Sequence, residues 1–168
     1  MIVVFKIEDK VVYGETGVCL IEDICEKEFI KNQKKKYYVL KPVLNSCNLI
    51  YAPIENGKVP MRKIITKQEA EELLKSIPHI LENMQEYTEV TFENYKEEII
   101  SHSPQKLVEL TARIYNRKKS VQLQKKRLNS IDEKYMKIAE NLLFGELAEA
   151  LDINIEDVQK YISQTIEK

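Results

Sequence analysis

The chain has 168 residues, of which 43% are hydrophobic and 32% charged, and its formal net charge is −1. This length fits one medium domain or two small ones, with enough apolar residues to bury a core. No apolar run approaches the length of a membrane span, and the first residues lack the pattern of a signal peptide. Three cysteines without a CxxC pair suggest neither a disulfide framework nor a zinc knuckle, so we expect a cytoplasmic protein without a metal or a cofactor.

The near-neutral total charge conceals strongly charged segments. Residues 68–109 carry three Lys/Arg against ten Asp/Glu, whereas residues 110–137 carry nine against two, a net of +7. Within residues 110–131 seven side chains are basic and none is acidic; these seven, the basic block, are Arg113, Arg117, Lys118, Lys119, Lys125, Lys126 and Arg127. Such segregation favours a polyanionic partner such as DNA. The alternative is a solvated helix C-terminus, where cations are also favourable.

The first 66 residues have the pattern of short strands. Runs rich in β-branched and aromatic residues predict strands near 10–13, 18–21, 36–41 and 48–52. Asn56-Gly57 predicts a two-residue hairpin turn, after which residues 58–65 return as a strand. Five short strands in this length indicate a small β-barrel of the SH3 or Tudor type.

The remainder has the 3.6-residue period of helices. Residues 66–69 form a capping box that opens a helix ending before Pro78, and a second helix is expected to start near Glu89. Ser103-Pro104 opens a third helix, because serine caps it and proline loses no hydrogen bond at the first position.

A second capping box, at residues 130–133, opens a long helix. The side chains expected to face inward from it are Ile131, Tyr135, Ile138, Leu142 and Leu143. Asn154 caps the last helix. The sequence therefore predicts an α+β protein, with a small SH3/Tudor-like β-barrel over residues 1–66 and a compact all-helical domain over residues 67–168.

The strand at residues 37–40 is apolar on both faces, although a small barrel buries only its inner face. The outer face must therefore pack on the helices or meet a partner. Addition of a partner strand to a barrel edge is a common mode of protein recognition.

The residues also resemble a known family. The opening stretch 5–13, the segments 17–18 and 21–24, the strand 36–41, and segment 53–56 are similar to the CarD family of bacterial transcription regulators. So are Ile114-Tyr115-Asn116-Arg117-Lys118-Lys119, Ser130, Glu133-Lys134, Met136 and Gly145-Glu146-Leu147-Ala148. The similarity runs in order to about Leu151. Transcription-repair coupling factors carry a barrel similar to the first part.

The resemblance implies an N-terminal domain that binds the β subunit of RNA polymerase and a helical domain that touches promoter DNA at the upstream edge of the transcription bubble. It also implies a regulator of open-complex stability that is not an enzyme. The residues expected to bind polymerase are Lys27, Phe29, Ile30, Tyr37 and Tyr51. Those expected to contact DNA are the basic block together with Tyr87 and Thr88.

This sequence departs from the family pattern in that region. It has no tryptophan, and the family's minor-groove wedge falls on Thr88, with Tyr87 beside it. Three carboxylates, Glu86, Glu89 and Glu93, surround this position and would repel phosphates. The alternative hypothesis is therefore a protein-interaction module that binds polymerase or another factor without engaging DNA.

An enzyme is the third class, and the residues argue against it. His79 and His102 are isolated, with no spacing typical of metal ligands. The paired glutamates at 71–72 and 97–98 are adjacent on helices and point apart, which is unsuitable for acid–base catalysis. We expect a monomer that binds neither a membrane nor a small-molecule substrate.

Overall fold

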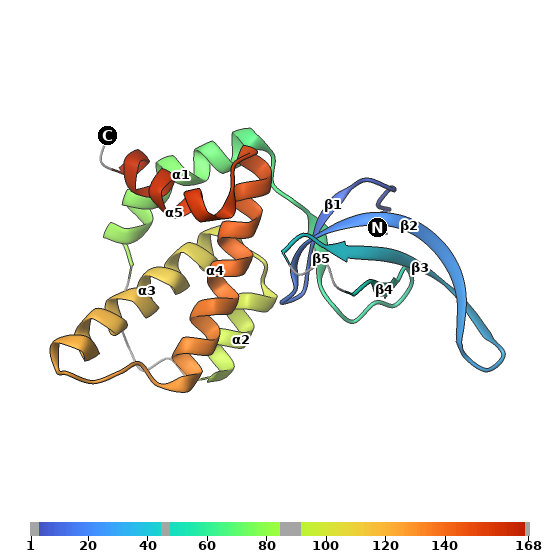
Figure 1. Cartoon of the computed structure of the whole chain (residues 1–168), viewed down its shortest axis with the longest axis horizontal. Helices are drawn as coiled ribbons and strands as arrows, with labels where there is room; N and C mark the ends of the chain where they lie inside the picture. Colours follow the sequence, from blue (N-terminus) through green and yellow to red (C-terminus); the bar gives the residue numbers. More distant parts are fainter. Residues whose placement is uncertain (1–3, 45–47, 85–91, 167–168) are drawn as a thin grey trace. The chain divides into compact units, whose positions relative to one another are not determined.

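A computed structural model describes residues 4–44, 48–84 and 92–166 of the chain. The chain divides into two compact units, Met1–Ile64 and Ile65–Lys168. Unit 1 contains the strands and unit 2 the helices (Figure 1). The predicted α+β class, with strands first and helices after them, is confirmed.

Unit 1 is a five-stranded antiparallel sheet. Its strands are β1 (Lys10–Tyr13), β2 (Gly17–Ile30), β3 (Gln33–Pro42), β4 (Ile50–Pro53) and β5 (Met61–Lys63). The strand order is β4-β3-β2-β1-β5, so among the described residues β4 and β5 form the two edges.

The core of unit 1 lies on one face of this sheet. Alternation along the strands places Val11, Cys19, Ile21 and Leu40 there, each fully buried. Phe5 packs edge-on against the ring of Tyr38, with 5.8 Å between the centroids. The Phe5 backbone N–H also donates to the Tyr38 hydroxyl at 3.1 Å, which satisfies that buried oxygen.

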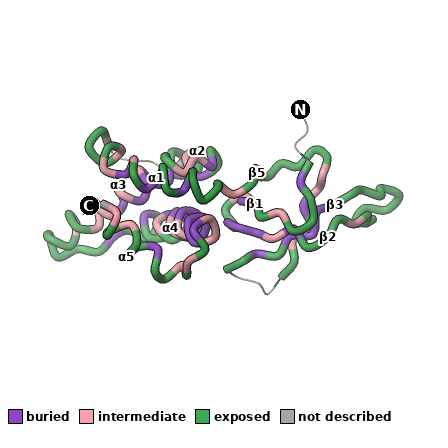
Figure 2. Tube along the Cα trace, turned by 90° about the horizontal axis from the view of Figure 1, so that it is seen from above, coloured by how far each residue is buried: buried purple, intermediate pink, exposed green. Residues whose placement is uncertain are grey.

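The hairpin formed by β2 and β3 is longer than the sequence predicts. Strand pairing continues from the core out to Ile30 and Gln33, past a register shift after Ile21. Asn32 turns the chain with a φ of 64°, in the left-handed region that asparagine tolerates. Every residue from 26 to 36 is exposed, as the green hairpin in Figure 2 shows. The outer half of this hairpin lacks an alternation of apolar and polar residues, so the sequence does not predict strands there.

The predicted hairpin at Asn56-Gly57 is wrong. Strand β4 pairs with β3, whereas β5 pairs with β1 at the opposite edge. The Gly14 N–H donates to the Pro60 carbonyl at 2.9 Å. This bond holds the residue before β5 beside the end of β1. Gly14 has a φ of +48°, and a Cβ there would lie 2.7 Å from Val59 Cγ1, so the approach requires glycine. Asn56 does turn the chain, with a φ of 55°, but it joins two strands that are not neighbours.

Unit 2 contains five helices, and one of them contacts all the other four. They are α1 (Lys67–Glu82), α2 (Phe92–Ile100), α3 (Pro104–Leu123), α4 (Ser130–Leu151) and α5 (Ile155–Ile166). Helix α4 contacts each of the other four, and its inner side chains Leu142 and Leu147 are fully buried. The predicted N-caps Thr66 and Ser103 are confirmed, with Thr66 in a complete capping box.

Two helix boundaries differ from prediction. Helix α1 continues through Pro78 to Glu82, because contacts with α3 and α5 outweigh one missing backbone hydrogen bond. Helix α4 is capped by Asn129, not Ser130: the Asn129 side chain accepts from the Asp132 N–H at 2.7 Å. The Ile131 side chain is 46% exposed, so its predicted inward position is also wrong. Glu89, the predicted start of the second helix, lies outside the described residues.

Candidate functional site

Three aromatic side chains meet on the outer face of the β2–β3–β4 part of the sheet. The Phe29 ring lies 5.1 Å from that of Tyr37 and 5.5 Å from that of Tyr51, both edge-on. We call these three residues the aromatic patch. Tyr37 is buried, but Phe29 is 59% and Tyr51 38% exposed. The structure therefore brings together three of the five residues predicted to bind polymerase. They form a partly exposed apolar surface, which is unfavourable in water and typical of an interaction site.

Lys27 lies on the same face as the aromatic patch. In the strand register Cys25 stands opposite Tyr37, and Lys27, two residues on, stands opposite Lys35. Like charges directly opposite one another destabilise an antiparallel pair. Neither lysine makes an ion pair within the part of the chain that the structure describes. This face therefore combines exposed aromatic rings with uncompensated positive charge. Ile30, the fifth predicted residue, is 60% exposed at the hairpin tip.

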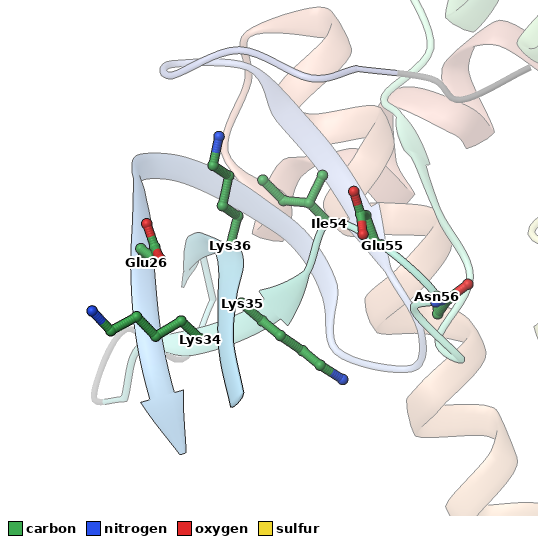
Figure 3. A pocket seen from close by; sticks show the side chains of 7 residues that line it. All are labelled: Glu26, Lys34, Lys35, Lys36, Ile54, Glu55 and Asn56. Atoms are coloured by element: carbon green, nitrogen blue, oxygen red, sulfur yellow. The ribbon is translucent and has the colours of Figure 1, made fainter. Parts of the chain in front are cut away.

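A hollow of about 310 Å³ lies beside the hairpin, lined by Glu26, Lys34, Lys35, Lys36, Ile54, Glu55 and Asn56. Figure 3 shows that the amino groups of the three lysines extend in different directions instead of converging. Glu26 also stands opposite Lys36 in the register. The hollow is consequently a poor site for a single anion.

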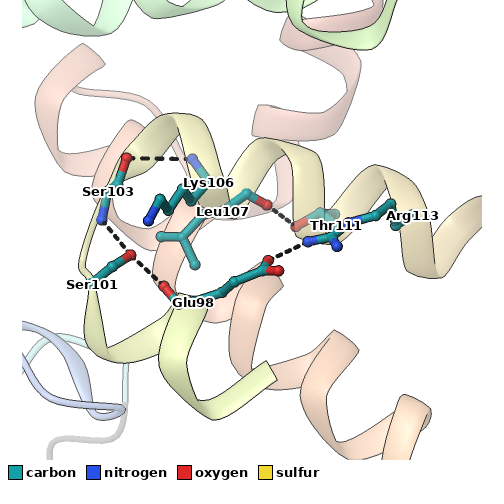
Figure 4. A network of polar contacts seen from close by, with 7 residues as sticks. All are labelled: Glu98, Ser101, Ser103, Lys106, Leu107, Thr111 and Arg113. Atoms are coloured by element: carbon teal, nitrogen blue, oxygen red, sulfur yellow. Dashed lines mark hydrogen bonds and ion pairs between the residues drawn. The ribbon is translucent and has the colours of Figure 1, made fainter. Parts of the chain in front are cut away.

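In unit 2, two side chains of the basic block form ion pairs, and the other five form none with the described residues. The Arg113 guanidinium forms an ion pair and hydrogen bond with the Glu98 carboxylate, which joins α3 to α2 (Figure 4). Arg117 Nε lies 2.7 Å from Asp132 Oδ2, which joins α3 to the first turn of α4. These two arginines, predicted to contact DNA, are thus engaged within the helical unit.

Asp132 is the centre of a buried polar network. Its side chain is only 4% exposed. Besides its ion pair with Arg117, it accepts a hydrogen bond from the Tyr95 hydroxyl at 2.7 Å and one from Asn129 Nδ2 at 2.9 Å. A carboxylate in the first turn of a helix is also favoured by the helix dipole. The network fixes α2, α3 and the turn before α4 to one another.

The lysines of the basic block and Arg127 have a different environment. Lys118, Lys126 and Arg127 line a hollow of about 260 Å³, and Lys137 joins them from α4. Lys125 is exposed in the turn after α3, with a φ of 58°. Lys119 lies at another groove of unit 2, of about 570 Å³, beside Tyr115. Tyr87 and Thr88 lie outside the described residues.

Sequence reasoning missed Lys137, Asp132 and Glu98. Lys137 is remote from the basic block in sequence and reaches it only because α4 packs on α3. Asp132 looked like part of a capping box, and nothing local distinguishes its buried carboxylate from an exposed one.

Two observations concern reactive groups and metal ligands among the described residues. They contain no group of three or more His, Cys, Asp or Glu placed to hold a metal ion. Burial raises the pKa of the Cys19 thiol to about 11, which suppresses the reactive thiolate. Burial, reinforced by a hydrogen bond to Glu140, raises the pKa of Tyr115 to about 12. None of the helices in the described ranges has the length and apolar character needed to cross a membrane.

Comparison with known proteins identifies unit 1. No curated protein matches the chain. Residues 5–65 match the family model of the CarD-like/TRCF RID domain, the module by which such proteins interact with RNA polymerase. The match covers all five strands and the whole aromatic patch and ends where unit 2 begins. Residues 5–65 are therefore a CarD-like/TRCF RNA-polymerase-interacting domain.

Proposed function

We propose that this protein is a non-catalytic transcription regulator that binds the β subunit of RNA polymerase through the aromatic patch and Lys27. The observation that carries the proposal is the position of Phe29: it lies within the matched domain, 59% exposed, in contact with Tyr37 and Tyr51. An aromatic cluster of this kind is typical of the centre of a protein interface.

The charges beside the patch indicate what the partner surface carries. Lys27 and Lys35 repel one another across the hairpin, and a carboxylate between them would relieve that repulsion. We infer an apolar contact site on the β subunit flanked by acidic side chains. Strand β4, which pairs only with β3 among the described residues, offers its outer edge for backbone pairing.

We further propose that unit 2 contacts promoter DNA through the unpaired members of the basic block and so modulates the stability of the open complex. Lys118, Lys126 and Arg127 gather on one side of the turn between α3 and α4. Lysine and arginine contacts to phosphates are independent of sequence and strongly weakened by salt.

Leu123 supports a contact of this kind. It is 87% exposed at the end of α3, two residues before Lys125. Minor-groove-binding proteins insert apolar side chains between base steps while nearby cations hold the phosphates. Among the described residues, Leu123 is thus a candidate for the minor-groove wedge, the role of a tryptophan in the family that the sequence resembles.

The polymerase contact is tested by capture. The tagged full chain is immobilised, a bacterial lysate is passed over it at moderate salt, and bound RNA polymerase is quantified. We expect capture by the parent and loss in the double variant Lys27→Ala/Phe29→Ala. The matched control Lys10→Ala/Ile7→Ala removes one exposed lysine and one exposed apolar side chain elsewhere in unit 1 and should retain capture. Equal capture by both variants would contradict the proposal.

A protein-interaction module without DNA contact is the second candidate. The internal pairing of Arg113 with Glu98 and of Arg117 with Asp132 favours it, because each pair removes a cation from the DNA-binding surface. The salt dependence of duplex binding distinguishes the two. Replacing Lys125, Lys126 and Arg127 by Ala should lower the log–log slope by up to about 0.9 per lost phosphate contact. An unchanged slope would favour the module without DNA contact.

A further inference from the structure

We propose that the hollow between the end of α3 and the start of α4 is a binding site for a phosphate or pyrophosphate group. It is lined by Lys118, Gln122, Lys126, Arg127, Leu128, Glu133, Met136 and Lys137 and has a volume of about 260 Å³. The proposal refines the DNA contact suggested above, but the hollow is defined by its own geometry and can be tested separately.

The first argument is the charge of the residues that line the hollow. Four cationic side chains line the hollow from three places: Lys118 on α3, Lys126 and Arg127 in the turn, and Lys137 on α4. Against them stands one lining carboxylate, Glu133. Four positive charges around one small volume repel one another, and a bound dianion or trianion removes that repulsion.

The second argument is that these cations have no ion-pair partner among the described residues. Over the ranges that the structure describes, none of the four forms an ion pair. By contrast, Arg113 and Arg117 on the same helix are paired with carboxylates. The cations that the fold requires are therefore neutralised, and those lining the hollow are left for a ligand.

The third argument excludes the simpler explanation from the helix dipole. Cations in the last turn of a helix are favourable without any ligand, but the last turn of α3 contains no basic residue. Lys137 lies in the second turn of α4, toward the N-terminal half of that helix, where the dipole gives a cation no stabilisation. The helix dipoles therefore do not account for the cations that line the hollow.

The floor of the hollow strengthens the interaction. Leu128 is 9% exposed, and Met136 beside it is half-buried. Apolar side chains displace water from beneath the charges and lower the local dielectric, so that each cation–phosphate contact is stronger than on an open surface. Arg127 adds planar, bidentate geometry toward two phosphate oxygens.

The phosphate can come from a DNA backbone or from a free phosphorylated molecule, and the test separates these sources. Inorganic pyrophosphate is titrated into the full chain at constant ionic strength, and binding is followed by calorimetry and by shifts of the Lys137 and Arg127 amide signals. We expect saturable binding. The variant Lys126→Ala/Lys137→Ala should weaken it by about tenfold or more, whereas Lys75→Ala/Lys160→Ala, with the same charge change at exposed positions outside the hollow and outside the basic block, should leave it within about twofold.

In a second, competition experiment a short DNA duplex is bound to the protein before pyrophosphate is added. Displacement of the duplex by pyrophosphate at constant ionic strength assigns the hollow to backbone phosphate. Pyrophosphate binding without displacement assigns it to a free phosphorylated ligand. Equal weakening by the two double variants, or the absence of saturable binding, would overturn the site. Failure of the unmutated protein to capture RNA polymerase would instead refute the proposed function without contradicting the phosphate site.

Discussion

Arg117 Nε lies 2.7 Å from Asp132 Oδ2, and this pair joins the middle of α3 to the first turn of α4. The basic block thus has two roles along the segment formed by α3 and the turn after it. Its two N-terminal arginines hold unit 2 together, whereas Lys118, Lys126 and Arg127 line a hollow and form no ion pair with another described residue. Charge alone does not distinguish these roles, because every member contributes equally to the net charge of the segment.

Replacing Asp132 by Asn should destabilise unit 2. The change leaves Arg117 facing a neutral amide in a largely buried site, and loss of one partner of such a pair costs about 3 kcal/mol. Chemical denaturation, followed by helical circular dichroism, measures this loss. The exposed Asp157→Asn is the matched control and should cost less than about 0.5 kcal/mol. Equal stability of the two variants would show that the network contributes nothing to the free energy of unfolding.

Tyr95→Phe isolates one bond of the same network. The Tyr95 hydroxyl donates to Asp132 Oδ1 at 2.7 Å, and the ring stays stacked on Tyr135 when only the oxygen is removed. A hydrogen bond to a charged group contributes about 1.5–3 kcal/mol, so the free energy of unfolding should fall by about that amount. In the Asp132→Asn background the same change should cost much less, and full additivity would contradict the coupling.

The Cys19 thiol should be unreactive in the folded protein. Burial raises its pKa to about 11, so at pH 8 about one thiol in a thousand is ionised, and the side chain is inaccessible. In a Cys25→Ser/Cys47→Ser background, a thiol-specific chromogenic reagent should react only after denaturant is added. Fast labelling of the native variant would show that this core opens readily.

Tyr115 should make stability depend on pH in the alkaline range. Its folded pKa is raised from 10.0 to about 12, first by burial and then by its bond to Glu140. A raised pKa means that the folded state holds the proton more tightly, so the stabilisation is complete below pH 10 and is lost as the pH rises toward 12. The midpoint of urea unfolding should therefore fall between these values in the parent. Tyr115→Phe should remove that part of the slope, and an unchanged slope would assign it to other groups.

Local signals predicted those elements that local interactions determine. Thr66 and Ser103 cap helices as expected, because a cap depends on residues three positions apart. Asn129 replaces Ser130 as the cap because both residues suit the role and the choice follows from the bond between Asn129 and Asp132. Asn56-Gly57 has the right turn chemistry, but which strands it joins depends on pairing with β1, a distant contact.

The candidate sites show the same division. Phe29, Tyr37 and Tyr51 were predicted together, and their ring contacts follow from strand pairing that places residues of three strands side by side. Lys137 could not be predicted, because its approach to Lys118 and Arg127 depends on the packing of α4 against α3. The pairing of Arg113 with Glu98 likewise requires a tertiary contact between α2 and α3.

The most direct test of polymerase recognition is site-specific photo-crosslinking. A photoreactive phenylalanine analogue at position 29 retains the aromatic ring and reports which subunit lies against the patch. In a mixture with purified RNA polymerase, we expect a crosslink to the β subunit from position 29 and none from position 7, which is 50% exposed elsewhere in unit 1. A crosslink from position 29 to a different subunit, or equal crosslinking from both positions, would contradict recognition of the β subunit through the aromatic patch.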